Sequence, residues 1–350
     1  MVYDVIVIGA GQSGLTVGYY LRRAKLDYLI LDGQEKAGGA WLHTWDSLQL
    51  FSPANHSSIS GWLMPKTEGA YPSRQEAIDY LTKYEQRYKL PVNRPVQVLN
   101  VTQDNGVFEL ETTQGQFQTK ALVSATGTWQ KPYVPSYKDQ ELFEGEQLHS
   151  AHYKNEQPFV NKNVMIVGGG NSAAQILAEV SQVAAQTTWI TLEDPEFLPD
   201  DVDGRYLFEY YTKLYQAQKE GRDLPKVSLA NIVMVDSVKE ARELNVLHAL
   251  PPFDGFDEDG VYWENGSHID LDAVIWCTGF KPALDYLKPL NIITPKGRIN
   301  TKLTKALDIE GLWTVGYGNW TGYASATLIG VGRTAQRTVK EIQEWLNDEV

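Results

Sequence analysis

The sequence predicts an α/β protein, and the main observation is a glycine motif that occurs twice. It reads VIVIGAGQSG at 5–14 and VMIVGGGNSA at 164–173. In each copy an apolar strand runs directly into Gly-x-Gly-x-x-Gly/Ala and a helix follows, which is how a βαβ unit holds a dinucleotide pyrophosphate. The length of 350 residues suits roughly two domains of about 150 residues each. We therefore expect two Rossmann-like dinucleotide-binding domains, so that electrons can pass between two cofactors.

The first domain is expected to start with a strand, a helix and a second strand that ends before Asp32. The composition of residues 34–72 predicts a long irregular segment, because it is rich in Gly, Ser, Pro and aromatic residues; such segments are often functional. A helix, a meander of three short strands and an apolar strand ending in Ala-Thr-Gly follow. The expected ranges in order are 4–8, 12–24, 28–31, 73–88, 96–101, 107–112, 116–120 and 121–127.

The second domain is expected to open at Lys162 and to repeat the same order of elements. Residues 195–260 show no clear pattern, and a further apolar strand ends in Thr278-Gly279. The remaining expected ranges are a helix at 171–185, strands at 188–191, 272–278 and 312–316, a helix from Thr327, and within it an amphipathic surface stretch at 333–350. These ranges predict a first domain at 1–155 plus 283–350, with a second domain at 156–282 inserted into it.

Composition narrows the classes of partner. The net charge of −13 argues against nucleic acid or an anionic membrane surface. No apolar run reaches the roughly 18 to 20 residues of a membrane span, and the N-terminus lacks a basic leader. We expect a cytoplasmic protein without membrane contact that acts on small molecules; the oligomeric state stays open, a homodimer included. The single cysteine, Cys277, excludes an intrachain disulfide and a Cys-x-x-Cys redox pair.

The first motif is completed by an acidic residue. Gly9 makes the tight turn, Gly11 lets the backbone approach phosphate, and Gly14 lets the helix pack on the strand. The helix N-terminus then stabilises the phosphate charge. Asp32 follows Gly9 by 23 residues and is placed to accept hydrogen bonds from ribose hydroxyls.

The second motif, formed by Gly168, Gly170 and Ala173, is followed by different residues. Thr191 stands 23 residues after Gly168, and Leu192, Glu193 and Asp194 come next. No Lys or Arg occurs between Lys162 and Arg205, although a 2′-phosphate is usually held by an arginine. We therefore predict that this site accepts NADH as well as NADPH, and that NADPH binds there without the usual arginine clamp on its 2′-phosphate. The alternative is an arginine contributed by a distant part of the fold.

Two further segments resemble the flavin-containing monooxygenases. The first is Gly38-Gly39-Ala40-Trp41. The more specific one is Phe143-x-Gly145-x-x-x-His149-x-x-x-Tyr153, which matches the signature of that family; related Baeyer–Villiger monooxygenases usually carry tryptophan where Tyr153 stands. The resemblance covers nearly the whole chain and implies FAD at the first motif and NADH or NADPH at the second. The chain looks closest to a small bacterial subgroup that tolerates NADH.

The resemblance implies a set of cofactor-binding residues. A C-terminal block from Gly316 to Trp320 resembles the region that closes over the flavin, and a helix beginning near Ala326 would point its positive end at the flavin. For FAD the candidates are Gly9, Gly11, Gln12, Ser13, Gly14, Asp32, Gly33, Gly39, Trp41, His43, Val98, Thr126, Gly127, Asn319 and Leu328. For NAD(P) they are Gly168, Gly170, Asn171, Ser172, Ala173, Thr191, Leu192, Glu193 and Thr278.

The chain also departs from the family. The animal members have an asparagine beside the flavin, and the matching stretch here, 50–55, places Phe51 and Ser52 nearest that position. Many flavoproteins have an aspartate where Asn319 stands. We name no certain catalytic residue; the flavin-adjacent candidates are Phe51, Ser52 and Trp320. No metal is expected, since His149 and His152 have no third ligand near them in sequence.

The resemblance implies an oxygen-transfer reaction. NAD(P)H reduces FAD, O2 adds at the flavin C4a, and the terminal oxygen passes to a soft nucleophile such as a thioether, which becomes a sulfoxide, or an amine. Baeyer–Villiger oxygenation of ketones is a side activity to be expected from the same oxidant. Two alternatives stay open: an NADH-dependent flavin oxidase or quinone reductase, and a non-catalytic flavin redox sensor. A disulfide reductase is disfavoured because it needs a cysteine pair.

Overall fold

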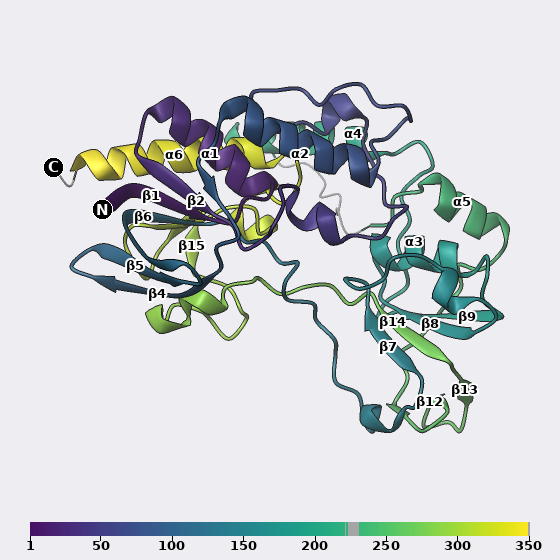
Figure 1. Cartoon of the computed structure of the whole chain (residues 1–350). Helices are drawn as coiled ribbons and strands as arrows, with labels where there is room; N and C mark the ends of the chain where they lie inside the picture. The colour runs from purple at the N-terminus through teal and green to yellow at the C-terminus, as the bar shows by residue number, and fades with distance from the viewer. Residues whose placement is uncertain (221, 223–230, 349–350) are drawn as a thin grey trace. The chain divides into compact units, whose positions relative to one another are not determined.

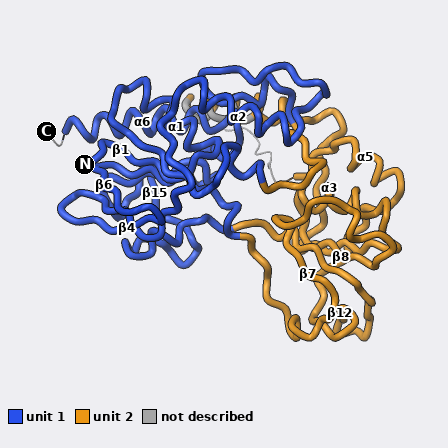
Figure 2. Tube along the Cα trace, viewed as in Figure 1, with its two compact units in different colours: residues 1–42, 52–131, 281–350 blue, residues 43–51, 132–280 orange. Residues whose placement is uncertain are grey.

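The computed structural model describes residues 1–220, 222 and 231–348, which form two compact units. Unit 1 comprises residues 1–42, 52–131 and 281–350, and unit 2 comprises residues 43–51 and 132–280 (Figure 2). Each unit is an α/β fold around its own sheet (Figure 1). The expected α/β class with two Rossmann-like halves is confirmed.

The core of unit 1 is a parallel sheet in the order β17-β6-β1-β2-β3. Val5 on β1 pairs with Tyr28 on one side and Ala121 on the other. The central strands are buried on both faces, as parallel strands require, and read as continuous apolar runs. The bounds are β1 Val2–Ile8, β2 Tyr28–Leu31, β3 Val92–Asn93, β6 Gly115–Ser124 and β17 Leu312–Thr314.

Three helices cover one face of this sheet, and a hairpin lies on the other (Figure 1). The helices are α1 (Gln12–Ala24), α2 (Arg74–Tyr88) and α6 (Val331–Asp348); the hairpin is β4 (Val98–Asp104) and β5 (Val107–Thr112). A capping box starts α2: the N–H of Glu76 donates to Ser73 Oγ at 3.2 Å, and the N–H of Ser73 donates to Glu76 Oε2 at 2.8 Å.

The main differences from the expected ranges in unit 1 lie at β6 and α6. The range 116–120 and the first four residues of 121–127 form the single strand β6, which pairs antiparallel with β5 and then continues between β1 and β17. An exposed alternating stretch and a buried apolar stretch thus belong to one strand. The last helix begins at Val331, because Thr327 and its neighbours form hydrogen-bonded turns. The expected surface helix to Val350 is described as far as Asp348.

Unit 2 has a five-stranded parallel sheet in the order β10-β9-β8-β14-β7. Helix α3 (Asn171–Val180) follows β8 as the motif predicts, but it ends five residues earlier than expected. The strands are β7 Glu146–His149, β8 Asn163–Val167, β9 Gln186–Ile190, β10 Ala249–Leu250 and β14 Ala273–Trp276.

The segment at 195–260 that showed no clear pattern contains two helices and several short strands. The helices are α4 (Gly204–Lys219) and α5 (Asp236–Glu243). A small antiparallel sheet of unit 2 consists of β11 Gly255–Phe256, β12 Gly260–Tyr262 and β13 His268–Asp270. The short strands carry too few residues for a periodic pattern to mark them.

The unit boundaries differ from the expected division at 155/156 and 282/283. Residues 132–155 group with unit 2 because β7 pairs with β14. Residues 43–51 also group with unit 2: the Ser47 hydroxyl contacts the Glu179 carboxylate, and Trp45 belongs to the same apolar core as Trp189. Within the described part of the chain, none of the helices has the length and apolar character needed to cross a membrane.

Candidate functional site

Two positions of the first glycine turn can hold only glycine. Gly9 has φ +99°, and a β-carbon there would stand 2.7 Å from the carbonyl oxygen of Ala125. A β-carbon on Gly14 would stand 1.8 Å from the carbonyl oxygen of Gly9, so α1 can start directly on β1. Around Gly11 the closest atom to such a carbon is 3.9 Å away. The turn therefore leaves an open cradle of backbone N–H groups at the N-terminus of α1, which suits a phosphate.

Segments distant in the sequence meet at this N-terminus. Gly39, with φ +58°, lies so close that a β-carbon on it would be 2.8 Å from Gly11 Cα. On the other side Gly316 approaches Ser13, because a β-carbon on Gly316 would stand 1.9 Å from Ser13 Oγ. The Gln12 side-chain amide donates to the carbonyl oxygen of Ala326 at 2.6 Å. The structure thus brings the Gly-Gly-x-Trp segment and the C-terminal block to the first motif.

Asp32 is a buried carboxylate held by an ion-pair triad. It is 5% exposed, and Arg94 donates from Nε to its Oδ2 at 3.1 Å. Glu85 holds the same guanidinium with both oxygens, at 2.7 and 2.9 Å. Burial raises the pKa of Asp32, and Arg94 counteracts this. Arg94 was missed from the sequence, because 62 residues separate it from Asp32 and no motif marks it.

Thr126 belongs to a chain of hydroxyl groups in unit 1, in which Ser124, Tyr286 and Tyr317 are buried. Its hydroxyl donates to the carbonyl oxygen of Ala283 at 2.8 Å, so Tyr317 must donate to Thr126 Oγ1 at 2.7 Å. Ser124 then donates to Tyr317 and accepts from Tyr286, each at 2.5 Å. Burial raises the pKa of both tyrosines, so the hydroxyls keep their protons. The direction of every bond in the chain is therefore fixed.

Other FAD candidates lie in unit 1 with more local roles. Ser52 is 3% exposed and shares a 2.7 Å hydrogen bond with Ser57 Oγ. Trp320 packs on Tyr317, with ring centroids 5.4 Å apart. The places of the rest are as follows: Trp41 in the 3-10 turn Gly39–His43, Gly33 after β2, Gly127 after Thr126, Asn319 in the 3-10 turn Asn319–Thr321, and Val98 and Leu328 buried at 8% and 5% exposure.

Two flavin-site candidates group with unit 2 instead. The carbonyl oxygen of His43 accepts from Lys154 Nζ at 2.5 Å. Phe51 packs on Phe208, with ring centroids 6.0 Å apart. Both contacts lie within unit 2, whereas the other FAD candidates group with unit 1.

The second glycine turn is built like the first. Gly168 has φ +138°, and a β-carbon there would stand 2.3 Å from the carbonyl oxygen of Cys277. Gly170 has no atom within 4 Å of its β-carbon position, so this turn is open to phosphate at the same place as the first. Ala173 is fully buried in α3. The indole N–H of Trp189 donates to the Gly168 carbonyl oxygen at 2.7 Å, a contact that sequence reasoning missed.

The residues after the second turn divide into buried and exposed. Asn171 uses its amide to hold residues 231–233: it donates to the Asn231 carbonyl at 3.1 Å and accepts from the Val233 N–H at 2.8 Å. Ser172 follows it in α3 and is half-buried, and the hydroxyl of Thr278 donates to the Tyr133 carbonyl. At the end of β9, Thr191 is 4% exposed, Leu192 is 86% exposed and Glu193 is exposed.

The signature residues have structural roles in unit 2. His149 Nδ1 accepts from the Ala151 N–H at 3.0 Å, so Nε2 carries the proton and donates to the Gly279 carbonyl at 2.9 Å. Burial lowers the pKa of His149, which favours this neutral form. The Tyr153 hydroxyl donates to Glu179 Oε2 at 2.8 Å. At Gly145 a β-carbon would stand 2.2 Å from the Phe143 ring. The signature thus fixes β7 to β14 and α3.

Comparison with known proteins agrees with this architecture. Residues 6–251 match the family described as pyridine nucleotide-disulphide oxidoreductase. The flavin-containing monooxygenase of Stenotrophomonas maltophilia is 48% identical, with a TM-score of 0.91 over 99% of this chain and 100% of that one. This chain is a flavin-containing monooxygenase.

Two further relatives of the flavin-containing monooxygenase cover nearly its whole length. The uncharacterised oxidoreductase CzcO of Bacillus velezensis is 31% identical over 97% of this chain and 99% of its own. A probable indole-3-pyruvate monooxygenase, YUCCA4 of Arabidopsis thaliana, is 26% identical over 98% and 90%. The enzyme therefore uses a flavin and a nicotinamide cofactor. The matched family is named for disulphide oxidoreductases, but this chain has a single cysteine, Cys277. Burial raises the pKa of the Cys277 thiol to about 12, so the thiol stays protonated and does not act as a redox nucleophile.

Proposed function

We propose that this flavin-containing monooxygenase binds FAD in unit 1 and NADH or NADPH in unit 2, and transfers one oxygen atom from O2 to thioethers or amines. Ketones are slower substrates in a Baeyer–Villiger reaction. The observation that carries the proposal is the pair of open glycine turns, Gly9–Gly14 and Gly168–Ala173, each at a helix N-terminus. The two turns supply two pyrophosphate cradles in one chain.

The residues of unit 1 fit FAD. The backbone N–H groups after Gly11 would hold the pyrophosphate, and Asp32 lies at the end of the neighbouring strand β2, where an adenosine ribose is expected. Because Arg94 and Glu85 fix the Asp32 carboxylate, its orientation is set before the ribose arrives. FMN has no adenosine ribose and would leave this buried carboxylate without a ligand.

The residues of unit 2 support the use of NADH. Helix α3 begins at Asn171 and would hold the pyrophosphate, and Thr191 lies beside the turn, 3.7 Å from the β-carbon position of Gly169. The exposed Glu193 and Asp194 follow it. Their carboxylates disfavour a 2′-phosphate by charge repulsion. A specificity constant for NADPH a hundredfold above that for NADH would contradict this part of the proposal.

When bound, the flavin supplies hydride acceptance and oxygen activation. The chain itself binds, orients and excludes water. His149 is not available as an acid or base, since both ring nitrogens are engaged by backbone groups. The hydroxyls of Ser124, Thr126 and Tyr317 hold the end of β6 beside Gly9, whose β-carbon position meets the carbonyl oxygen of Ala125.

The deciding experiment measures oxygen transfer with a thioether. The purified protein should be yellow, release FAD on denaturation, and convert methyl phenyl sulfide to its sulfoxide with one atom from ¹⁸O2 for each NADH consumed. Hydrogen peroxide formed in equal amount with NADH, without sulfoxide, would indicate an oxidase instead. A yellow protein that does not oxidise NADH would indicate a sensor. A protein that cannot be loaded with FAD would contradict the proposal as a whole.

A further inference from the structure

One stretch of unit 1 has a charge opposite to that of the protein. Residues 281–305 contain six basic residues and a single acidic one, Asp285, which gives this stretch a net charge of +5. The whole chain carries −13. Positive charge concentrated in one segment of an acidic protein creates a local potential that attracts anions.

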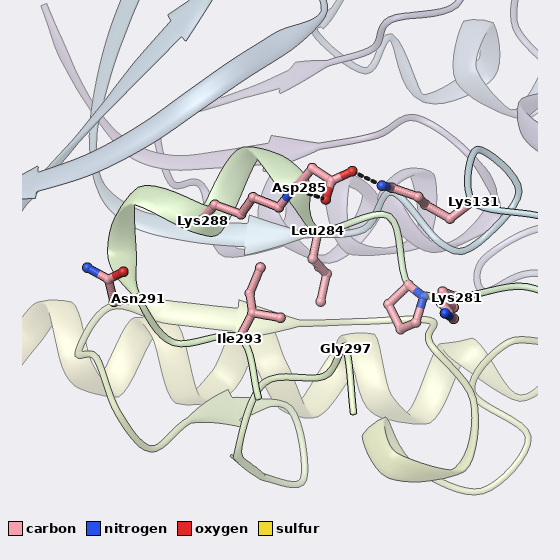
Figure 3. Close-up of a pocket in the computed structure, with 9 residues that line it drawn as sticks. Lys131, Lys281, Leu284, Asp285, Lys288, Asn291, Ile293 and Gly297 are labelled. Carbon is pink, nitrogen blue, oxygen red and sulfur yellow. Dashed lines mark ion pairs between the residues drawn. The ribbon is translucent and has the colours of Figure 1, made fainter. Parts of the chain in front are cut away.

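A pocket of about 520 Å³ opens in this stretch (Figure 3). Its volume lies within the range of small-molecule sites. Its charged lining consists of Lys131, Lys281, Asp285 and Lys288, and its apolar lining includes Leu284 and Ile293. All of these residues belong to unit 1, and none of them is part of the two glycine turns.

Asp285 gathers two of the lysines at one side of the pocket. Its Oδ1 accepts from Lys288 Nζ at 2.9 Å, and its Oδ2 pairs with Lys131 Nζ. These contacts lower the pKa of Asp285, so it stays ionised. With Asp285 counted against three lysines, the lining has a net charge of +2. The ion pairs therefore position the ammonium groups without neutralising the pocket.

The other side of the pocket is apolar. Leu284 is 2% exposed, and Figure 3 shows Leu284 and Ile293 pointing toward the same space. Ile293 is fixed by a bridge to Ile299. Lys131 and Lys281 are adjacent, since the N–H of Lys281 donates to the Lys131 carbonyl at 2.8 Å. These two lysines are the last residue of unit 1 before residues 132–280 and the first after them.

We propose that this pocket binds a small organic anion, in which a carboxylate or phosphate group is attached to a short apolar part. The anionic group contacts the lysines, and the apolar part rests on Leu284 and Ile293. A ligand here contacts both Lys131 and Lys281, so it ties together the two points where the chain leaves and re-enters unit 1. The inference does not depend on the proposed oxygenase activity.

Binding is tested by calorimetry on the full-length protein with matched probes. Hexanoate and hexyl phosphate carry the expected charge and apolar part, acetate lacks the apolar part, and hexylammonium reverses the charge. We expect heat from hexanoate or hexyl phosphate at concentrations up to about 10 mM, and the tighter of the two identifies the anionic group. Acetate and hexylammonium should bind at least about tenfold more weakly.

Variants separate the pocket from the general charge of the segment. The double substitution K281Q/K288Q keeps the Lys131–Asp285 pair and should weaken hexanoate binding at least about tenfold. The control K302Q/K340Q removes the same charge from two exposed lysines of unit 1 that do not line the pocket, and should have less than about a twofold effect. Equal weakening by both variants, equal binding of hexylammonium, or no heat from either anionic probe would overturn the proposal. Circular dichroism verifies that both variants fold.

Discussion

Trp189 and Gly168 are joined by a hydrogen bond from the indole Nε1 to the glycine carbonyl, 2.7 Å long. The tryptophan is 1% exposed and lies on β9, next to the strand from which the second turn emerges. A turn that must keep its N–H groups open for a ligand is thus held from behind by a side chain. The same strand ends at Ile190, directly before Thr191, so one element both supports the turn and leads into the residues that follow it.

Replacing Trp189 with Phe should weaken nicotinamide binding without loss of the flavin. The variant leaves a buried carbonyl without a donor and a smaller ring in the core, which together cost about 2–3 kcal/mol in the free energy of unfolding. We expect a several-fold rise in the KM for NADH. The matched control is Trp313→Phe, a fully buried tryptophan of unit 1 whose indole donates to Glu341 at 3.3 Å. If the control raises the KM equally, the effect is one of global stability.

Equivalent glycine-to-alanine substitutions in the two turns should each remove a different cofactor. Gly9→Ala forces a β-carbon onto the Ala125 carbonyl and should abolish the yellow colour, with FAD affinity reduced at least about tenfold. Gly168→Ala meets the Cys277 carbonyl and should keep FAD but lose NADH binding. Flavin absorbance per mole of protein and NADH titration measure the two effects. The control Gly106→Ala also has positive φ but open space around it, and should cost only roughly 1 kcal/mol.

Arg94→Gln should reduce both stability and FAD affinity. The substitution leaves Asp32 and Glu85 without their cation at a site where all three side chains are mostly buried, which costs about 2–4 kcal/mol. Arg94→Lys keeps the charge but not the planar guanidinium group. Its stability and FAD affinity should lie between those of Arg94→Gln and wild type. Arg242→Gln breaks a similar two-point pair with Asp200 at an exposed site, so the urea midpoint and the FAD content should both stay close to those of wild type.

His149 and His268 should affect the pH dependence of stability with opposite signs. Burial lowers the pKa of His149 below its ordinary value of 6.5, so the unfolded chain binds this proton first and stability falls as the pH drops below 6.5. His149→Gln should flatten that fall by at most about 1.4 kcal/mol per pH unit.

A hydrogen bond to Asp257 raises the pKa of the partly exposed His268. Its contribution to stability is present below pH 6.5 and is lost as the pH rises through the pKa of His268 in the folded protein. Urea unfolding from pH 5 to 8 tests both signs.

The hydroxyl chain predicts a graded response. Tyr317→Phe removes the acceptor of the Thr126 N–H, 3.2 Å away, and of the Ser124 hydroxyl, so it should destabilise unit 1 by about 1–3 kcal/mol. Tyr286 stands at the start of the chain and donates to Ser124, so Tyr286→Phe should cost less than Tyr317→Phe, about 1 kcal/mol. A Tyr286 variant less stable than the Tyr317 variant would contradict the derived direction of the bonds.

Most of the fold followed from the sequence because its strands are apolar runs next to glycine turns. The ranges 12–24 and 28–31 agree with α1 and β2 to the residue. The errors lie where pattern and packing disagree. Residues 116–120 alternate like an edge hairpin but continue as β6, and the turns after Ala326 contain no glycine or proline until Gly330 to signal that α6 starts later.

The site was predictable where the motif specifies geometry and not where it depends on tertiary contacts. The two glycine turns, and the close approach of Gly39 and Gly316 to α1, could be predicted because glycine is the residue that such tight backbone contacts require. Arg94, Trp189 and Tyr317 lie far in sequence from the groups they hold, so no spacing rule reveals them. Asn171 was expected at the cofactor but holds residues 231–233, because its amide is within reach of that backbone.

The geometry around His149 changes what a match to the signature tells a genome annotator. Phe143, Gly145, His149 and Tyr153 all act by packing or by bonds to the scaffold of unit 2. A match to these four residues therefore reports the architecture of unit 2 and carries no information on the molecule that is oxidised. A screen for new activities among proteins that share the signature should therefore sample variation outside it.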